Sequence, residues 1–235
     1  MSARVFRDGR VEIVVPLRAR PAEVARFVAQ HRSWIERTQQ RERRVAPLHP
    51  PASRWLPVPR LELQALSEIW RVTHLEWPGA ARLRRVMPRP GAGAEDGREL
   101  LLQARAQDQS GMRRLLVDWL RERLRTAALE LLPPLAALMR SDYSAVRVGA
   151  QRSRWGSCSR NGTLSLNCCL LFQRPEVLRY LLVHELAHRR HMNHGARFWQ
   201  HVATYEPDWR ALDRELSAGW RRVPPWLFTR AGVME

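Results

Sequence analysis

Residues 174–190 read RPEVLRYLLVHELAHRR, and this stretch is the most informative about the fold of the chain. Its hydrophobic residues recur at helical spacing, and Pro175 stands in the first turn, where a helix tolerates proline. We therefore predict a helix over residues 174–190. His184 and His188 are four residues apart, so they lie one turn apart on the same face of that helix. The hydrophobic positions are Val177, Leu178, Leu181, Leu182 and Leu186.

Two imidazoles one turn apart can bind one metal ion, each with a ring nitrogen roughly 2.0–2.1 Å from zinc. Glu185 stands between the two histidines in sequence but points to another side of the helix. It is free to accept a proton from a zinc-bound water as a general base and to pass it to a leaving amine. The pattern His-Glu-x-x-His is typical of zinc metallopeptidases. The alternative is that the histidines are core residues that only make hydrogen bonds.

A catalytic zinc site takes three protein ligands and leaves a further position for water. His194 is the best candidate for the third ligand. Ten residues of straight helix would carry it about 15 Å along the axis from His184, so the helix must break after His188. Asn193 and Gly195 are suitable breakers because both tolerate left-handed backbone conformations.

Two other residues are rival third ligands, and we rank both below His194. Glu206 would complete the site as a glutamate on a following helix. His191 lies about 10 Å of helical rise from His184, too far for one ion to bind both. The candidates for an oxyanion donor are Tyr205, His201, Arg197 and His191. Asp208 or Glu206 could orient a ligand imidazole.

Several short motifs occur in a fixed order between residues 153 and 209. They are Ser153-Arg154-Trp155-Gly156-Ser157-Cys158, Leu166-Asn167, His184 to His188, Asn193-His194-Gly195 with Phe198-Trp199, and Pro207-Asp208-Trp209. In this order they resemble the YgjP-like metallopeptidases, also called domain of unknown function 45. The run from His194 to Phe198 is also similar to SprT and Spartan-type DNA-associated proteases, whose third zinc ligand is that histidine. The resemblance implies His184, His188 and His194 as zinc ligands and Glu185 as the catalytic residue. It does not extend to residues 45–109.

The order of the other elements predicts an α+β, zincin-like metallopeptidase domain over residues 110–235, with a small three-stranded sheet against helices. A smaller, β-rich N-terminal region over residues 1–109 precedes it. Strands are expected over 11–17, 61–65, 68–76, 82–86, 100–104, 143–148, 154–159 and 163–172. Helices are expected over 21–40 and 111–132, the second ended by Pro133-Pro134. A Pro-rich connection is expected over 46–59, and turns at 91–97 and Asn161-Gly162.

An edge strand beside the metal can pair with an extended peptide and hold a scissile amide there. We expect the strand over 154–159 or the strand over 163–171 to be that edge. Trp155 is expected to be a packing residue.

Composition favours a globular chain. Hydrophobic residues make up 45% of the 235 and charged residues 27%, and no apolar run approaches membrane-spanning length. Glu12 interrupts the only apolar stretch near the amino end, so a cytoplasmic location is expected. The cysteines, Cys158, Cys168 and Cys169, do not form a disulfide framework or a Cys-x-x-Cys pair. They are expected to pack as small hydrophobic residues in strands.

The formal charge is +17, and all 40 basic residues are arginine. Arginine binds phosphate in bidentate fashion and stacks on bases, so nucleic acid is a candidate partner. GC-rich coding explains the arginine content equally well. The sequence thus predicts a zinc metallopeptidase that cleaves proteins or peptides, including nucleic-acid-associated proteins. Two alternatives remain: a zinc-containing nucleic-acid-binding protein without peptidase activity, and a hydrolase of some non-peptide amide.

Overall fold

The computed structural model describes residues 1–5, 11–16, 19–44, 58–86 and 98–228. The chain divides into two compact units, Met1–Pro50 and Pro51–Glu235. The predicted Pro-rich connection over 46–59 lies almost wholly outside the described residues, and the predicted turn over 91–97 lies outside them entirely.

The first unit is a two-stranded antiparallel hairpin followed by a long helix. β1 (Ser2–Val5) pairs with β2 (Val11–Val14), and α1 spans Pro21–Arg44. The Glu23 carboxylate accepts a hydrogen bond of 3.0 Å from the backbone N–H of Arg20, which satisfies a donor at the start of α1. The strand and helix predicted here are present; β2 is shorter than expected and α1 is longer.

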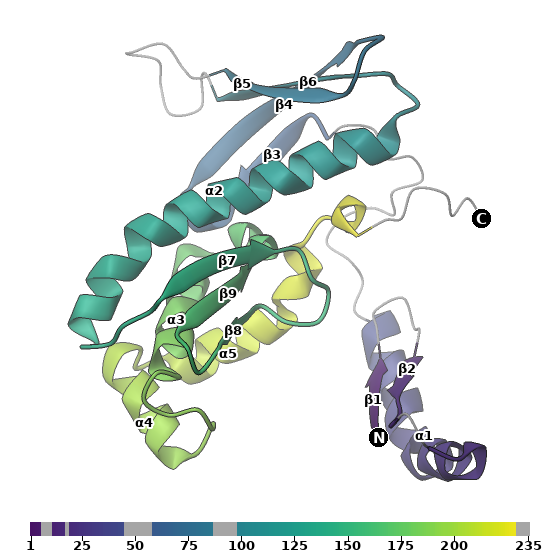
Figure 1. The fold of residues 1–235 in the computed structure, drawn as a ribbon, viewed down its shortest axis with the longest axis vertical. Coiled ribbons are helices and arrows are strands. Elements are labelled where there is room, and N and C mark those ends of the chain that lie inside the picture. The colour runs from purple at the N-terminus through teal and green to yellow at the C-terminus, as the bar shows by residue number, and fades with distance from the viewer. Residues whose placement is uncertain (6–10, 17–18, 45–57, 87–97, 229–235) are drawn as a thin grey trace. The chain divides into compact units, whose positions relative to one another are not determined.

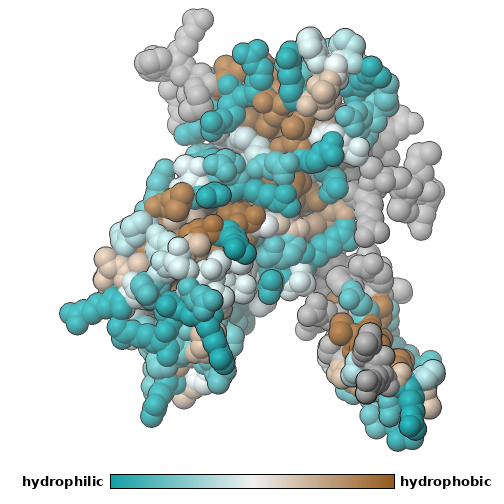
Figure 2. Space-filling view, viewed as in Figure 1, coloured by the Kyte–Doolittle hydropathy of each residue, from teal (hydrophilic) through white to brown (hydrophobic). Residues whose placement is uncertain are grey.

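The second unit begins with a four-stranded sheet of order β3-β4-β6-β5, in which β4 and β6 are parallel and the other pairs are antiparallel. Its strands are β3 (Arg60–Leu63), β4 (Glu68–Glu76), β5 (Arg82–Val86) and β6 (Glu99–Ala104), with the 3-10 turn η1 (Gln64–Leu66) after β3. Leu100, Leu102 and Ala104 alternate along β6 and are fully buried, so one face of the sheet belongs to the core. On the face drawn in Figure 2, polar residues cover most of this unit and hydrophobic residues gather at the four-stranded sheet.

Helix α2 (Gln109–Leu138) runs between this sheet and a second, three-stranded sheet, contacting β5 and β6 of the first and β7 of the second (Figure 1). The Asp108 carboxylate caps its start by accepting a hydrogen bond of 2.8 Å from the N–H of Gly111. Buried residues lie along the whole length of the helix. The helix therefore joins the two sheets into one core.

The predicted end of this helix at Pro133-Pro134 is wrong, because α2 continues through both prolines to Leu138. A proline inside a helix removes a hydrogen bond and crowds the preceding turn, at a cost of about 3 kcal/mol. Here the turn around the prolines is held by packing: Leu132 and Met139 are fully buried, and Leu135 is 8% exposed. Burial of such side chains contributes roughly 1.5–3 kcal/mol each, which is enough to offset the loss.

The three-stranded sheet has the order β7-β9-β8, with β7 parallel and β8 antiparallel to β9. Its strands are β7 (Ala145–Gly149), β8 (Gly156–Cys158) and β9 (Thr163–Asn167). The predicted turn between β8 and β9 is confirmed, and Gly162 has a φ of 78°, which glycine adopts without strain.

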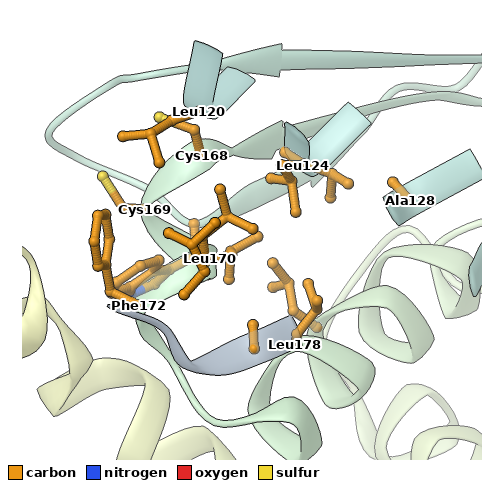
Figure 3. Close-up of a cluster of buried hydrophobic side chains, with 14 of the residues drawn as sticks. Leu120, Leu124, Ala128, Cys168, Cys169, Leu170, Phe172 and Leu178 are labelled. Atoms are coloured by element: carbon orange, nitrogen blue, oxygen red, sulfur yellow. The ribbon is translucent and has the colours of Figure 1, made fainter. Parts of the chain in front are cut away.

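Strand β9 ends earlier than predicted, and this changes the place of the cysteine pair. Cys168 and Cys169 lie in the 3-10 helix η2 (Cys168–Phe172), not in a strand. The Asn167 side chain causes the change by accepting a hydrogen bond of 3.1 Å from the N–H of Cys169, which caps η2. Both cysteines are fully buried among hydrophobic side chains, as Figure 3 shows, so their expected packing role is confirmed.

Up to residue 228, five helical segments follow η2, of which the first packs on β8 and the next two pack on the first. They are α3 (Pro175–Ala187), α4 (Ala196–Tyr205), α5 (Trp209–Ala218), η3 (Gly219–Arg222) and η4 (Pro225–Leu227). The predicted mixed α+β architecture, with a small three-stranded sheet against helices, is confirmed. No helix in the described part of the chain is long and apolar enough to cross a membrane.

Candidate metal centre

Three histidine side chains meet at the end of α3. One nitrogen from each of His184, His188 and His194 lies within 4.8 Å of the corresponding atoms of the other two. The Nε2 atoms of His184 and His194 are 3.0 Å apart. Two nitrogens bound tetrahedrally to one zinc ion would lie about 3.3–3.4 Å apart, so little movement would let these rings share an ion.

The chain brings His194 back to this place because α3 ends at Ala187, three residues before the predicted end at residue 190. The last helical residue is Ala187, and the N–H groups of Arg189 and His191 make the closing turn by donating to Leu186 and Ala187 carbonyls at 3.0 Å. The predicted break is therefore present, but its expected cause is wrong. Gly195 has a φ of −77°, and Asn193 is not among the described residues with positive φ.

A hydrogen bond from the His188 ring shows which of its two nitrogens is available to bind a metal. Its Nδ1 lies 3.1 Å from the His191 carbonyl oxygen, which can only accept. Nδ1 therefore carries the proton, and the lone pair is on Nε2. Burial lowers the pKa of His188, and it lowers the pKa of His184 to about 3, with help from the charges of His188 and His194. These two imidazoles are neutral near pH 7, the form that binds a metal.

The two rival ligands have other places. The Glu206 carboxylate is bound by the Arg179 guanidinium, which also donates to the Tyr205 carbonyl at 3.4 Å. The His191 ring packs 5.8 Å from the His201 ring, and only its carbonyl reaches the metal-site histidines. Within the described residues, the one group of possible metal ligands consists of His184, His188 and His194.

Glu185 is buried beside this group, with 3% of its surface exposed. Burial raises its pKa from 4.5 to about 8, and the positive charge of Arg154 opposes this rise. Its Oε2 has no hydrogen-bond partner among the described residues. An unpartnered carboxyl oxygen in a buried place is rare, and such groups occur where chemistry needs them.

Gly156 at the start of β8 makes room for this carboxyl group, a role that sequence reasoning missed. A Cβ at this position would lie 2.5 Å from Glu185 Oε1, so any other residue would displace the carboxyl. Asn167 was missed as well. Its Nδ2 donates to the carbonyls of Gln151 and Arg154 at 2.7 and 2.8 Å, and so holds the loop that leads into β8. Both residues belong to the motifs of the family resemblance, which was the available signal.

Strand β8 is an edge of its sheet, whereas β9 lies between β7 and β8. Of the two strands expected as the free edge, 154–159 contains it and 163–171 does not. The Trp155 carbonyl accepts from the N–H of Asn167, and the N–H of Ser159 donates to the Thr163 carbonyl. The backbone groups of Trp155 and Ser159 therefore point toward β9. By the alternation of an antiparallel pair, the N–H and C=O groups of Gly156 and Cys158 point to the open side. Trp155 itself is a packing residue, buried and stacked 4.0 Å from the Trp220 ring.

The roles expected for the oxyanion donor and for ligand orientation stay predictions. Arg197 is exposed at the start of α4, and the Tyr205 ring packs 5.3 Å from the His201 ring. Asp208 precedes α5 without a side-chain capping bond. The groups that do support the ligand imidazoles are the His191 carbonyl and the Tyr180 hydroxyl, whose oxygen lies 3.4 Å from His184 Nδ1.

Two solved structures are similar to part of the chain. The metallopeptidase zymogen abylysin of Pyrococcus abyssi is 25% identical over 38% of this chain and 92% of its own, with a TM-score of 0.35. The metallopeptidase zymogen jannalysin of Methanocaldococcus jannaschii is 20% identical over 37% of this chain and 91% of its own, with a TM-score of 0.34. Comparison with the curated proteins finds no match.

The family model of the YgjP-like metallopeptidase domain matches residues 1–218, which include both compact units up to the end of α5. The matched range contains the three clustered histidines, Glu185 and the β8 edge. A metallopeptidase hydrolyses peptide bonds with the help of a metal ion, and the donor set of three neutral or exposed imidazoles suits such an ion. This chain belongs to the YgjP-like family of metallopeptidases.

Proposed function

We propose that this chain is a zinc-dependent metallopeptidase in which His184, His188 and His194 hold the ion and Glu185 is the general base. The observation that supports this most is the convergence of three ring nitrogens within 4.8 Å, with a buried carboxyl group on the adjoining residue. Zinc is the proposed metal because imidazole ligands suit it and because three protein ligands leave a position open for water.

A bound zinc ion would supply Lewis acidity here, lowering the pKa of water and of the neighbouring carboxyl group. Glu185, as the carboxylate, accepts a proton from the attacking water as the water oxygen bonds to the carbonyl carbon. The same carboxyl group then donates this proton to the amide nitrogen as the C–N bond breaks. The products are a carboxylate and an amine. The unpartnered Oε2 of Glu185 is the atom available for this transfer.

The free edge of β8 is the proposed peptide-binding strand. Gly156 and Cys158 point backbone N–H and C=O groups to the open side, and a Cβ at position 156 would lie 2.5 Å from Glu185 Oε1. An extended peptide paired with these groups would pass directly over the general base. Backbone pairing makes little demand on side chains, so broad sequence tolerance is expected.

We further propose that the substrates include proteins bound to nucleic acid. Residues 145–167, which contain the whole three-stranded sheet, have no acidic residue. Their four arginines are all exposed: Arg147, Arg152, Arg154 and Arg160. Such a surface favours polyanions, and its affinity for single-stranded DNA should fall steeply as salt rises. Affinity that does not change with salt would contradict this part of the proposal.

The test is cleavage of unfolded proteins by the zinc-loaded wild type and by Glu185→Gln, with and without single-stranded DNA. Glu185→Gln should keep zinc but lose turnover by at least about a thousandfold, because it removes the proton carrier. Glu176→Gln is the matched control, since Glu176 is an exposed carboxylate on the same helix. Cleavage that persists in Glu185→Gln would overturn the proposed base.

The same experiment separates the alternative functions. A zinc-containing nucleic-acid-binding protein without peptidase activity would bind DNA equally well as the wild type and as Glu185→Gln, and would cleave nothing in either form. A hydrolase of non-peptide amides would leave proteins intact but cleave small amides in a manner dependent on Glu185.

A further inference from the structure

Tyr180 lies one helical turn before His184 on α3 and is fully buried. Its hydroxyl oxygen is 3.4 Å from His184 Nδ1 and 2.8 Å from Oδ1 of Asp213. Asp213 belongs to α5, so the contact joins two helices that are far apart in sequence. The hydroxyl thus stands between a carboxylate and a metal-site imidazole.

The direction of these two hydrogen bonds follows from the number of protons. A tyrosine hydroxyl has one proton, and an ionised carboxylate can only accept. A tyrosine hydroxyl keeps its proton near pH 7. That proton is donated to Asp213, and the Tyr180 oxygen can then only accept from Nδ1–H of His184. The lone pair of His184 is consequently on Nε2, the atom that faces His194.

We propose that Tyr180 and Asp213 are positioning residues that hold His184 in the tautomer and orientation able to bind the metal. The inference rests on the proposed function, because it concerns the same three ligands. Metal-site histidines usually donate the second ring N–H directly to a carboxylate or carbonyl, and His188 does so with the His191 carbonyl. At His184 the Tyr180 oxygen takes that place, and the Asp213 carboxylate acts through it. We call this pair of contacts, from Asp213 through Tyr180 to His184, the relay.

The relay can be tested without disturbing the backbone, because Tyr180 and Asp213 both act through their side chains. Tyr180→Phe removes the hydroxyl, and with it both the oxygen that accepts from His184 and the donor to Asp213. Asp213→Ala removes the acceptor of the Tyr180 proton, which leaves the hydroxyl free to donate to Nδ1 and so favours the wrong tautomer. Asp213→Asn keeps an oxygen that accepts the Tyr180 proton, so this variant should retain most of the zinc affinity of the wild type.

The readout is zinc affinity, measured by competition with a chromophoric chelator, together with the unfolding free energy of each metal-free variant. Tyr180→Phe and Asp213→Ala should each weaken zinc binding about 10–100-fold. The double variant should bind zinc with about the affinity of the weaker-binding single variant, because both substitutions act through one hydrogen bond to His184. Tyr143→Phe and Asp118→Asn, which make the same changes outside this contact, should bind zinc as the wild type does.

Three results would overturn the relay: zinc affinity in Tyr180→Phe equal to that of the wild type, losses that multiply in the double variant, or losses in Asp213→Asn as large as in Asp213→Ala. If Tyr180→Phe does not fold, the two Asp213 variants carry the test alone. A wild type that binds zinc and cleaves protein while Tyr180→Phe is unaltered refutes only the relay. A wild type that binds no zinc refutes the proposed function and the relay with it.

Discussion

Replacing Glu185 with glutamine should make the metal-free protein more stable at high pH. In the metal-free protein the pKa of Glu185 is raised by burial from 4.5 to about 8. The folded chain therefore holds this proton more tightly than the unfolded chain between these two pH values. The unfolding free energy of the wild type falls as pH rises through this window, and the full loss is present above pH 8.

The size of the effect follows from the same shift. A rise from 4.5 to about 8 corresponds to roughly 5 kcal/mol at about 1.4 kcal/mol per pKa unit. Water penetration and relaxation around buried charges reduce such penalties, so this is an upper bound. Glutamine does not titrate and fills nearly the same space. We expect Glu185→Gln to exceed the wild type by about 2–5 kcal/mol at pH 9 and by little at pH 4.

The assay is urea unfolding of both metal-free proteins at pH 4 and pH 9, followed by tryptophan fluorescence. The lowered pKa values of His184 and His188 affect both proteins alike and cancel in the difference. A difference between variant and wild type that is the same at both pH values would refute the claim that Glu185 is buried as an unpartnered acid.

Three further substitutions test the surroundings of Glu185. Gly156→Ala places a Cβ 2.5 Å from Glu185 Oε1, so the cleavage rate should fall at least about tenfold with zinc content unchanged. In the control Gly195→Ala the new Cβ meets nothing within 4 Å, and the cleavage rate should equal that of the wild type. Equal activity in both variants would contradict the close contact. Cys158→Pro removes an N–H from the open edge of β8 and should abolish cleavage without loss of zinc, so normal cleavage rates would exclude this edge as the peptide-binding strand. Asn167→Ala breaks two hydrogen bonds to loop carbonyls and should lower the unfolding free energy by about 1–3 kcal/mol in urea titrations, and an unchanged midpoint would show that the loop does not depend on it.

The metal helix could be predicted from sequence because its chemistry is local. Two histidines at a spacing of four and a hydrophobic stripe define one helix face, and the reach of a straight helix requires a break before His194. Strands β4 and β5 were also predicted with the bounds that the structure shows, since hydrophobic alternation and turn residues mark their ends. Each of these inferences needs only neighbours along the chain.

The errors occurred where distant contacts override local preference. The Pro133-Pro134 pair ends most helices, but burial of Leu132 and Leu135 keeps α2 continuous. The hydrophobic run after Thr163 looks like one strand until the Asn167 side chain caps a 3-10 helix in its middle. Neither effect is visible in the periodicity of the segment itself.

Residues that support the site could not be predicted for the same reason. The contact between Gly156 and Glu185 joins a strand edge to a helix, and Asp213 on α5 reaches His184 through Tyr180 on α3. Only a tertiary structure brings such pairs together. Tyr180 alone left a local signal, because it lies four residues before His184 and so on the same helix face.

The division of the chain into residues 1–109 and 110–235 stays a proposal. Residue 109 is the first of α2, and α2 packs against both sheets. The boundary between the two compact units instead falls between Pro50 and Pro51 in the sequence. Limited proteolysis that releases a folded fragment beginning near residue 51 would favour the second division over the first.

The most direct test of the proposed metal centre is anomalous X-ray scattering at the zinc edge from crystals of the zinc-loaded protein. We expect one strong peak per chain, within about 2.0–2.1 Å of the Nε2 atoms of His184, His188 and His194. An ion bound elsewhere, or one that Glu206 or His191 holds in place of His194, would contradict the proposal.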